Sequence, residues 1–386
     1  MLKIIGILVS IALLAGGYFV FMHLPTKVDA KMNAVSPRAD YSISNDALQL
    51  HDQLRVADLH ADTLLWKRDP AKRHTFGQTD LPRFRQGGVV VQVFSTVTFV
   101  PAGQNEQSNA AKGDLIRQLA MAQGWPPSTW FSIYERAAHQ ARGLKRLESD
   151  NFIIAYTKTD LIEGLKAREV QDDMLIGILA TEGAHPLEGK LNNIDRLYDH
   201  GFRLIGLQHF FDNKLGGSLH GAEKGGLTPF GKQAVERMVG KGMMIDVAHS
   251  SIKVVEDVLK LTDAPLIVSH TGILSLCDHP ARNIPDRLMQ QIADGGGLIG
   301  IGYWEMAVCD TSPDGIADML IHGANQFGVD HIALGSDFDG SIKAEFDTSQ
   351  LALLTNALMR KGMNEADIAK VMGENLIAYL SRNLPD

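Results

Sequence analysis

The chain has 386 residues, of which 45% are hydrophobic and 21% are charged. This length suits one large α/β barrel or two ordinary domains, and the composition excludes a disordered or a fibrous protein. The formal net charge is −8 and the basic residues form no cluster, which argues against nucleic acid as a partner.

The N-terminal segment is strongly apolar. Residues 4–22 carry no charge and are long enough to cross about 30 Å of hydrocarbon. We expect residues 1–24 to be an uncleaved transmembrane anchor. The alternative is a cleaved signal peptide with a weak processing site at Val28-Asp29-Ala30, which would release a secreted protein. Residues 25–42 are expected to be a linker, and residues 43–386 the folded body.

In the folded body one pattern recurs: a short run rich in Val, Ile and Leu ends in a polar residue, and a loop and a helical stretch follow. Short apolar runs that alternate with helices indicate parallel strands buried on both faces. The pattern therefore predicts a (β/α)8 TIM-type barrel. The predicted strands are residues 56–62, 89–97, 152–156, 175–182, 204–209, 243–249, 266–270, 298–303 and 332–337.

Nine runs are one too many for such a barrel. Residues 152–156 are the expected surplus, because only this run ends without a chemically useful side chain. Residues 100–150 form the longest connection between predicted strands. An insertion of this kind either covers a functional site or is a surface excursion, and the sequence leaves both possibilities open.

Ionisable side chains stand at the C-terminal ends of the predicted strands, where barrel enzymes build their active sites. Taken singly, a histidine there is more often a structural residue, and an aspartate is often a helix cap. Because side chains alternate along a strand, however, each of these groups continues a row that would face the barrel interior. They are His60, Asp62, Glu182, His209, His249, His270 and Asp337.

Burying these groups unpaired would cost several kcal/mol each, and a bound metal centre removes that cost. Histidine and carboxylate ligands suit zinc, with cobalt, manganese or iron as alternatives. A set this rich in carboxylates can hold two ions, which would activate one water between them.

The motifs around these residues resemble the membrane dipeptidase (renal dipeptidase) family of zinc metallopeptidases, whose fold is similar to the amidohydrolase barrels. Each motif is short, but the whole set, in the family's order, is very specific. The resemblance implies hydrolysis of the dipeptide amide bond by a hydroxide that bridges two zinc ions. The matching stretches are Asp58-Leu59-His60-Ala61-Asp62, Thr181-Glu182-Gly183, Gly206-Leu207-Gln208-His209, Gly226-Leu227-Thr228-Pro229-Phe230-Gly231, Ile245-Asp246-Val247-Ala248-His249-Ser250, Val268-Ser269-His270, Arg282-Asn283-Ile284-Pro285-Asp286 and Gly335-Ser336-Asp337-Phe338-Asp339-Gly340.

The resemblance also implies which residues bind the metal ions. His60, Asp62 and Glu182 resemble the ligands of the first zinc ion. Glu182 would bridge to the second zinc ion, which His249 and His270 complete.

Four further positions resemble residues that act on the substrate. His209 matches the histidine that hydrogen-bonds the scissile carbonyl, and Asp337 matches the general base that takes the proton from the bridging water. Arg282 matches the arginine that holds the substrate carboxylate, a task that suits its planar guanidinium. Tyr303 falls where the family has a tyrosine near the substrate.

The sequence departs from the family pattern at Leu59, Ala61 and Phe94 and in the loop of residues 211–226. These departures put the choice of substrate side chains in doubt and leave the reaction unchanged. Two rival functions remain. A related deacylase or lactonase would share the metal ions without needing Arg282. A non-catalytic binding protein on the same barrel would be expected to have lost a ligand or Asp337.

Cys277 and Cys309 are the only cysteines, and neither belongs to a Cys-x-x-Cys pair. From the residues alone, two buried thiols and one bridge are about equally expected. The resemblance implies a bridge, because the family carries cysteines in these two loops. A bridge requires an oxidising compartment, so we expect a membrane-anchored protein whose catalytic body is extracytoplasmic, for example periplasmic. The resemblance further suggests a homodimer.

Overall fold

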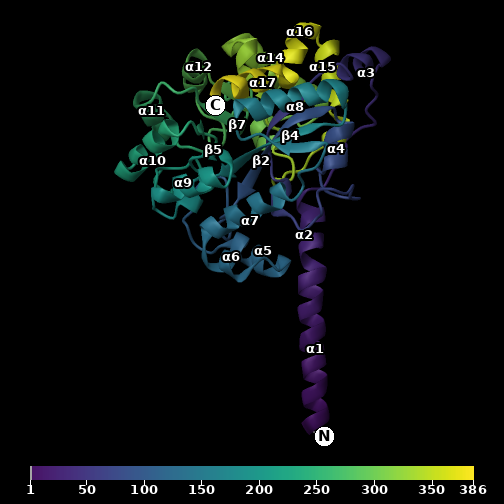
Figure 1. Cartoon of the computed structure of the whole chain (residues 1–386), viewed down its shortest axis with the longest axis vertical. Helices are drawn as coiled ribbons and strands as arrows, with labels where there is room; N and C mark the ends of the chain where they lie inside the picture. Colours follow the sequence, from purple (N-terminus) through teal and green to yellow (C-terminus); the bar gives the residue numbers. More distant parts are fainter. Residues whose placement is uncertain (1) are drawn as a thin grey trace.

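The computed structural model describes residues 2–386, which contain a closed parallel barrel surrounded by helices (Figure 1). The barrel strands are β1 (Val56–Ala61), β2 (Val89–Val97), β4 (Leu175–Glu182), β5 (Phe202–Gly206), β6 (Met244–Asp246), β7 (Ile267–Thr271), β8 (Leu298–Ile301) and β9 (Ile332–Leu334). They pair in chain order, with β2 joined to β4, and β9 closes the barrel against β1. The predicted eight-stranded TIM-type fold is confirmed.

Helices connect the strands and cover the outside of the barrel (Figure 1). They are α3 (Asn45–His51), α4 (Leu81–Gln86), α5 (Leu115–Gln123), α6 (Pro127–Phe131), α7 (Ile133–Lys145), α8 (Lys158–Val170), α9 (Asn192–Asp199), α10 (Pro229–Gly240), α11 (Ile252–Leu261), α12 (Asp286–Asp294), α13 (Glu305–Val308), α14 (Pro313–Phe327), α15 (Ala352–Arg360), α16 (Glu365–Ala369) and α17 (Asn375–Asn383). Each barrel strand has helices on one face and the barrel interior on the other, and all its residues are buried. This explains why the strands read as continuous apolar runs.

The surplus run forms a ninth strand outside the closed barrel. This strand, β3 (Phe152–Ile154), pairs with Leu175–Gly177 at the beginning of β4. Further along β4, Leu179–Thr181 pairs with β5. β3 therefore extends the sheet at the N-terminal end of β4 and takes no part in closing the barrel, as the sequence pattern predicted.

Six strands, β1, β3, β5, β6, β8 and β9, end earlier than the apolar runs predicted, and the difference is largest in β5, β6 and β9. β5 ends at Gly206, β6 at Asp246 and β9 at Leu334, so His209, His249 and Asp337 lie in the turns that follow. His249 and Asp337 have φ values of 62° and 59°, in the left-handed region that a strand does not use. Strand alternation therefore does not orient these three side chains. The inward orientation of these side chains was predicted from strand alternation. That explanation was wrong, because the backbone of the turns determines where they point.

The chain begins with two helices, α1 (Leu2–Met22) and α2 (Leu24–Met32). The helical stretch Ile5–Met32, which spans both helices, is long enough to cross a membrane and contains an 18-residue window with a mean hydropathy of 2.3, although a signal sequence has the same properties. The expected linker at residues 25–42 is held against the barrel. Asp29 pairs with Arg68 at 2.7 Å, and Val35 forms a β-bridge with Ala344.

Cys277 and Cys309 form a disulfide bond, with their Cα atoms 5.5 Å apart. The bond joins the segment after β7 to the segment after β8. Asn283 reinforces the same connection, since its amide nitrogen donates to the carbonyl oxygens of Cys277 at 3.0 Å and Ala307 at 3.2 Å. The structure thus supports the bridge that the family resemblance implied.

Replacing both cysteines by serine should lower the free energy of unfolding by about 3–4 kcal/mol, because the bond closes a loop between residues 32 positions apart. Urea unfolding measures this change. Metal content should stay the same, since neither sulfur belongs to the predicted ligand set. Unchanged stability in the double variant, or two alkylatable thiols in the oxidised natural chain, would contradict the prediction.

Candidate active site

The ionisable residues predicted to end the strands lie together at the C-terminal end of the barrel strands. Three stand on strands β1, β4 and β7, and the others stand in the turns that follow β1, β5, β6 and β9. All are buried. The residues on the strands are His60, Glu182 and His270, and the residues in the turns are Asp62, His209, His249 and Asp337.

One carboxylate oxygen, Oε1 of Glu182, stands at the centre of the cluster. Its distances to histidine Nε2 atoms are 3.9 Å to His60, 3.3 Å to His209, 3.2 Å to His249 and 3.4 Å to His270. An oxygen that faces so many ring nitrogens could bind a metal ion together with them.

His60 connects this centre to two further carboxylates. Its Nε2 atom lies 3.5 Å from Asp62 Oδ1 and 3.8 Å from Asp337 Oδ1. The residues thus form overlapping groups whose potential ligand atoms lie within 4.8 Å of one another: His60, Glu182 and His270; Glu182, His209 and His249; and His60, Asp62 and Asp337.

Hydrogen bonds behind the cluster determine which nitrogen of His270 carries a proton. The hydroxyl of Ser269 donates to Asp246 Oδ2 at 2.6 Å, and its oxygen lies 2.7 Å from His270 Nδ1. Since that hydroxyl proton is already used, His270 Nδ1 must be the donor. A neutral His270 therefore presents an unprotonated Nε2 atom to the cluster.

The same reasoning applies to His249. His220 Nδ1 lies 2.9 Å from the carbonyl oxygen of Glu106, which can only accept, so His220 carries its proton there. Burial lowers the pKa of His220 to about 4, and its neutral ring leaves Nε2 as an acceptor. His249 Nδ1, 3.1 Å from that atom, is then the donor, and the Nε2 atom of His249 is left free.

The Nε2 atoms of His249 and His270 lie only 2.9 Å apart, although both are unprotonated by this argument. Burial lowers the pKa of both rings well below the usual value, which disfavours a shared proton. Within the described residues, His60 Nε2 and Asp62 Oδ1 are buried without a hydrogen-bond partner. Facing lone pairs and unpaired ligand atoms are what a site for cations requires.

The charges of the cluster lead to the same conclusion. Burial, and then the neighbouring carboxylate of Asp62, raise the pKa of Glu182 well above its usual value. Burial also raises the pKa of Asp337 to about 8, although His60 acts in the opposite direction. Burial disfavours charge on His60, but the surrounding carboxylates outweigh it and raise its pKa to about 10. The buried carboxylates thus attract positive charge, and bound cations would supply it in place of a proton on His60.

Arg282 is buried beside the cluster, and Tyr303 is buried with its ring against Phe338 and Phe346. Arg282 Nη2 donates to the carbonyl oxygen of His270, and its guanidinium lies 4.9 Å from the ring centre of Trp304. Burial lowers the pKa of Arg282 to about 10, which still leaves it charged at neutral pH. Arg282 Nε and the Tyr303 hydroxyl have no partner among residues 2–386, so both remain available to a ligand.

The sequence reasoning missed Asp246, Ser269 and His220 as supporting residues. Asp246 and Ser269 stand within the matched motifs, so their position beside the predicted ligands was a usable indication. His220 belongs to the loop of residues 211–226, where the sequence departs from the family pattern. No sequence pattern indicated that this loop would return to His249.

The insertion at residues 100–150 contributes to the site through its first part. Asn109 donates from its backbone nitrogen to the carbonyl oxygen of His220 at 2.8 Å, and Glu106 accepts from His220. The later part forms α5, α6 and α7, and α5 contacts α2. The sequence left open whether the insertion covers a functional site or is a surface excursion, and each is true of one part. The first part supports the cluster, and the rest covers the flank of the barrel.

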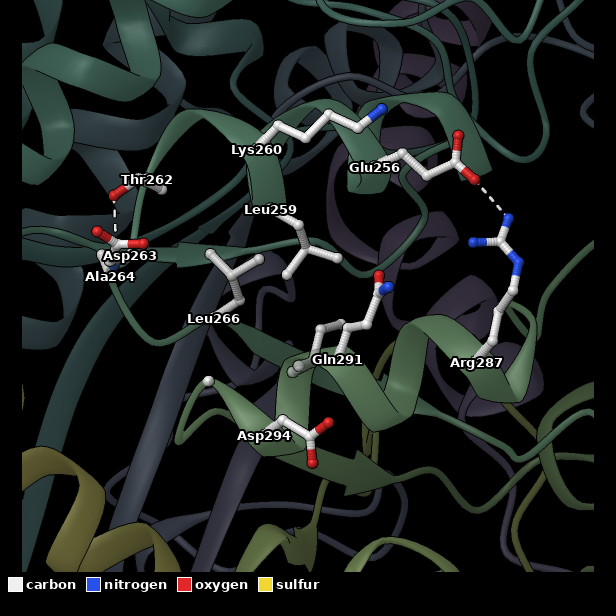
Figure 2. Close-up of a pocket in the computed structure, with 12 residues that line it drawn as sticks. Glu256, Leu259, Lys260, Thr262, Asp263, Ala264, Leu266, Arg287, Gln291 and Asp294 are labelled. Carbon is white, nitrogen blue, oxygen red and sulfur yellow. Dashed lines mark hydrogen bonds and ion pairs between the residues drawn. The ribbon is translucent and has the colours of Figure 1, made fainter.

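A large surface groove lies elsewhere on the molecule. It has a volume of about 620 Å³ and lies between α11 and α12, where Glu256 and Arg287 form an ion pair across it (Figure 2). Its lining residues belong to the outer helices and their connections, and none belongs to the cluster. The groove is therefore separate from the candidate active site.

The family model described as membrane dipeptidase, peptidase family M19, matches residues 44–382. The chain belongs to the membrane dipeptidase family. It is similar to dipeptidase aclJ of Aspergillus oryzae, at 26% identity over 86% of this chain and 79% of that protein. It is also similar to dipeptidase tcpJ of Claviceps purpurea, at 27% identity over 79% of this chain and 69% of that protein. The predicted family and class of enzyme, a metallo-dipeptidase, are confirmed.

Solved structures show the same fold. A metallopeptidase from Rhodobacter sphaeroides, liganded with a phosphinate mimic of the dipeptide L-Ala-D-Ala, has 24% identity and a TM-score of 0.66 and covers 86% of this chain and 99% of its own. The probable dipeptidase PvdM from Pseudomonas aeruginosa has 20% identity and a TM-score of 0.69, over 87% of this chain and 97% of its own. At these identities the likeness supports the barrel fold.

Replacing His220 by alanine should weaken metal binding by about 10- to 100-fold, because His249 loses the partner that holds its ring and tautomer. Glu182→Ala should abolish metal binding, since its oxygen faces all the candidate nitrogen ligands. Competition with a chelator, followed by elemental analysis, measures both effects. His200→Ala removes an exposed histidine and is the control. Equal metal affinity in His220→Ala and the control would show that the hydrogen bond is not needed.

Proposed function

We propose that this metallo-dipeptidase uses two zinc ions to hydrolyse dipeptides that have a free C-terminal carboxylate. The observation that carries the proposal is the convergence of four histidines on Glu182 with a buried arginine beside them. The nitrogen and oxygen atoms could hold the ions, and the arginine could hold the substrate carboxylate close to the scissile bond.

His60, Asp62 and Glu182 would hold one ion, and Glu182, His249 and His270 the other. The mixed set of ring nitrogens and carboxylate oxygens fits zinc, while cobalt, manganese and iron accept similar ligands. When bound, the ions lower the pKa of the attacking water and polarise the amide carbonyl.

The remaining roles belong to side chains of the protein. Burial lowers the pKa of His209 well below the usual value, so the ring is neutral and keeps one N–H group. That group would donate to the carbonyl oxygen as it gains negative charge. Asp337 would take the proton that the attacking water loses and return it to the leaving amine.

Arg282 would limit the substrate to short peptides. Its charged guanidinium stands beside the cluster, so a carboxylate bound there would lie about one residue from the bond that is cleaved. Tyr303 would donate its hydroxyl to the substrate: burial, and then the charge of Asp58, raise the pKa of Tyr303 well above its usual value and keep it protonated. A deacylase or lactonase would have no need of Arg282.

We further propose that the enzyme works outside the cytoplasm. The apolar N-terminal helix is suited to cross or enter a membrane, and the disulfide bond requires an oxidising compartment. Residues 1–24 would anchor the catalytic body at the outer side of the membrane, in the periplasm or an equivalent space. Cleavage of the leader would instead yield a secreted enzyme.

A panel of dipeptides, including some with a C-terminal residue of D configuration, tests the proposed reaction. We expect hydrolysis to stop after treatment with a chelator and to return when zinc is added. Dipeptide amides should be poor substrates, because they have no carboxylate for Arg282. Equal rates for free and amidated dipeptides would contradict the dipeptide assignment and favour a deacylase.

Arg282→Lys should raise KM by about 10- to 100-fold, the loss expected for one charge-assisted hydrogen bond, while kcat falls less. Lysine keeps the positive charge and loses the planar pair of donors. The control is Arg287→Lys, which alters an exposed arginine of the outer groove and should leave both constants unchanged (Figure 2). Steady-state kinetics on one good dipeptide decide this. A fall in kcat at constant KM would assign Arg282 to the chemical step.

A further inference from the structure

Helix α2 is connected to the loop that carries Asp337 by buried polar contacts. Arg68 stands at the centre of these contacts. Its Nε atom donates to Asp29 Oδ2 at 2.7 Å, and its Nη2 atom lies 2.6 Å from Asp339 Oδ2. The side chains of Asp29, Arg68 and Asp339 are exposed by 2%, 5% and 0%. Removing one member of such a buried group would leave an unpaired charge behind.

A second contact runs directly from α2 to the same loop. Asn33, just after the end of the helix, donates from Nδ2 to Asp29 Oδ1 at 2.8 Å. Its Oδ1 atom accepts the backbone N–H of Ser341 at 2.9 Å. The N-terminal segment thus holds the loop at two points, through the side chain of Asp339 and through the backbone of Ser341.

The loop needs such support because its backbone is strained. Asp337, Asp339 and Ser341 have φ values of 59°, 64° and 66°, in a region that residues with side chains rarely adopt. Strained conformations persist only where the surroundings hold them. Gln78 provides part of this hold, since its backbone nitrogen donates to Asp339 Oδ1 at 2.8 Å and its Oε1 atom accepts from Asp339 N at 2.7 Å.

We propose that Asp29 and Asn33 are positioning residues for Asp337, so that α2 supports the loop that carries this residue. The inference rests on the proposed role of Asp337 in proton transfer. Figure 1 shows α2 where α1 meets the body, beside α5. Processing after Ala30 would remove Asp29 and leave Arg68 and Asp339 without their partner. On this proposal a chain processed there would be less active, and the N-terminal segment serves catalysis as well as attachment.

Variants of the full chain test this positioning role. In Asp29→Ala we expect kcat to fall about 10- to 100-fold while KM changes less than about threefold, because the proton-transfer group shifts and Arg282 still binds substrate. Asn33→Ala should act in the same direction. Asp29→Asn keeps one acceptor oxygen and should recover part of kcat. Lys31→Ala, at an exposed position of the same helix, is the matched control and should leave kcat unchanged.

Hydrogen–deuterium exchange gives a readout that depends neither on activity nor on bound metal. Exchange in peptides covering residues 335–342 should be faster in Asp29→Ala and Asn33→Ala, and unchanged in β4, β5 and the control. Unchanged exchange and kcat would overturn the proposal, and so would faster exchange throughout the barrel. If the natural chain hydrolyses no dipeptide, the proposed function fails, while the exchange data still decide whether α2 holds the loop.

Discussion

Glu182 places one carboxylate oxygen within 3.2–3.9 Å of four histidine nitrogens, in the buried interior of a closed barrel. Such a concentration of ionisable groups is unfavourable unless charge is supplied to it, and much of the structure around it can be understood as meeting that constraint. Closure of the barrel makes the convergence possible, because it brings the C-terminal ends of non-neighbouring strands such as β1 and β7 to one place. The family's metal dependence follows the same logic, since cations remove the cost of burying the ligands.

The groups behind the cluster determine its chemistry as much as the ligands do. Asp246, through Ser269, directs the proton of His270 away from the centre, and His220 does the same for His249. His220 is in turn held by Glu106, at the start of the long insertion. Segments that look peripheral in the sequence therefore control which nitrogen atoms are free to bind a metal ion.

The remaining parts of the site are held from the periphery in a similar way. The disulfide bond and Asn283 tie together the segments after β7 and β8, and Arg282 lies in the first of these segments. After the neighbouring strand β9, α2 contacts the loop of Asp337 through Arg68 and Asn33. The residues proposed to bind substrate and to transfer the proton thus have two separate supports, one covalent and one formed by buried hydrogen bonds and ion pairs.

The sequence by itself determined the barrel, its surplus strand and the family, because apolar runs and short motifs are local properties of the chain. It also named the residues that the structure brings together in the cluster, since polar groups at strand ends are recognisable without knowing where the strands meet. Only the tertiary structure decided how His209, His249 and Asp337 are aimed, because all three lie in turns beyond the strand ends, where strand alternation no longer applies, and His249 and Asp337 adopt left-handed backbone conformations. The roles of His220, and of Asp29 and Asn33 in an expected linker, likewise depend on contacts between segments far apart in the chain, and no local pattern encodes such contacts.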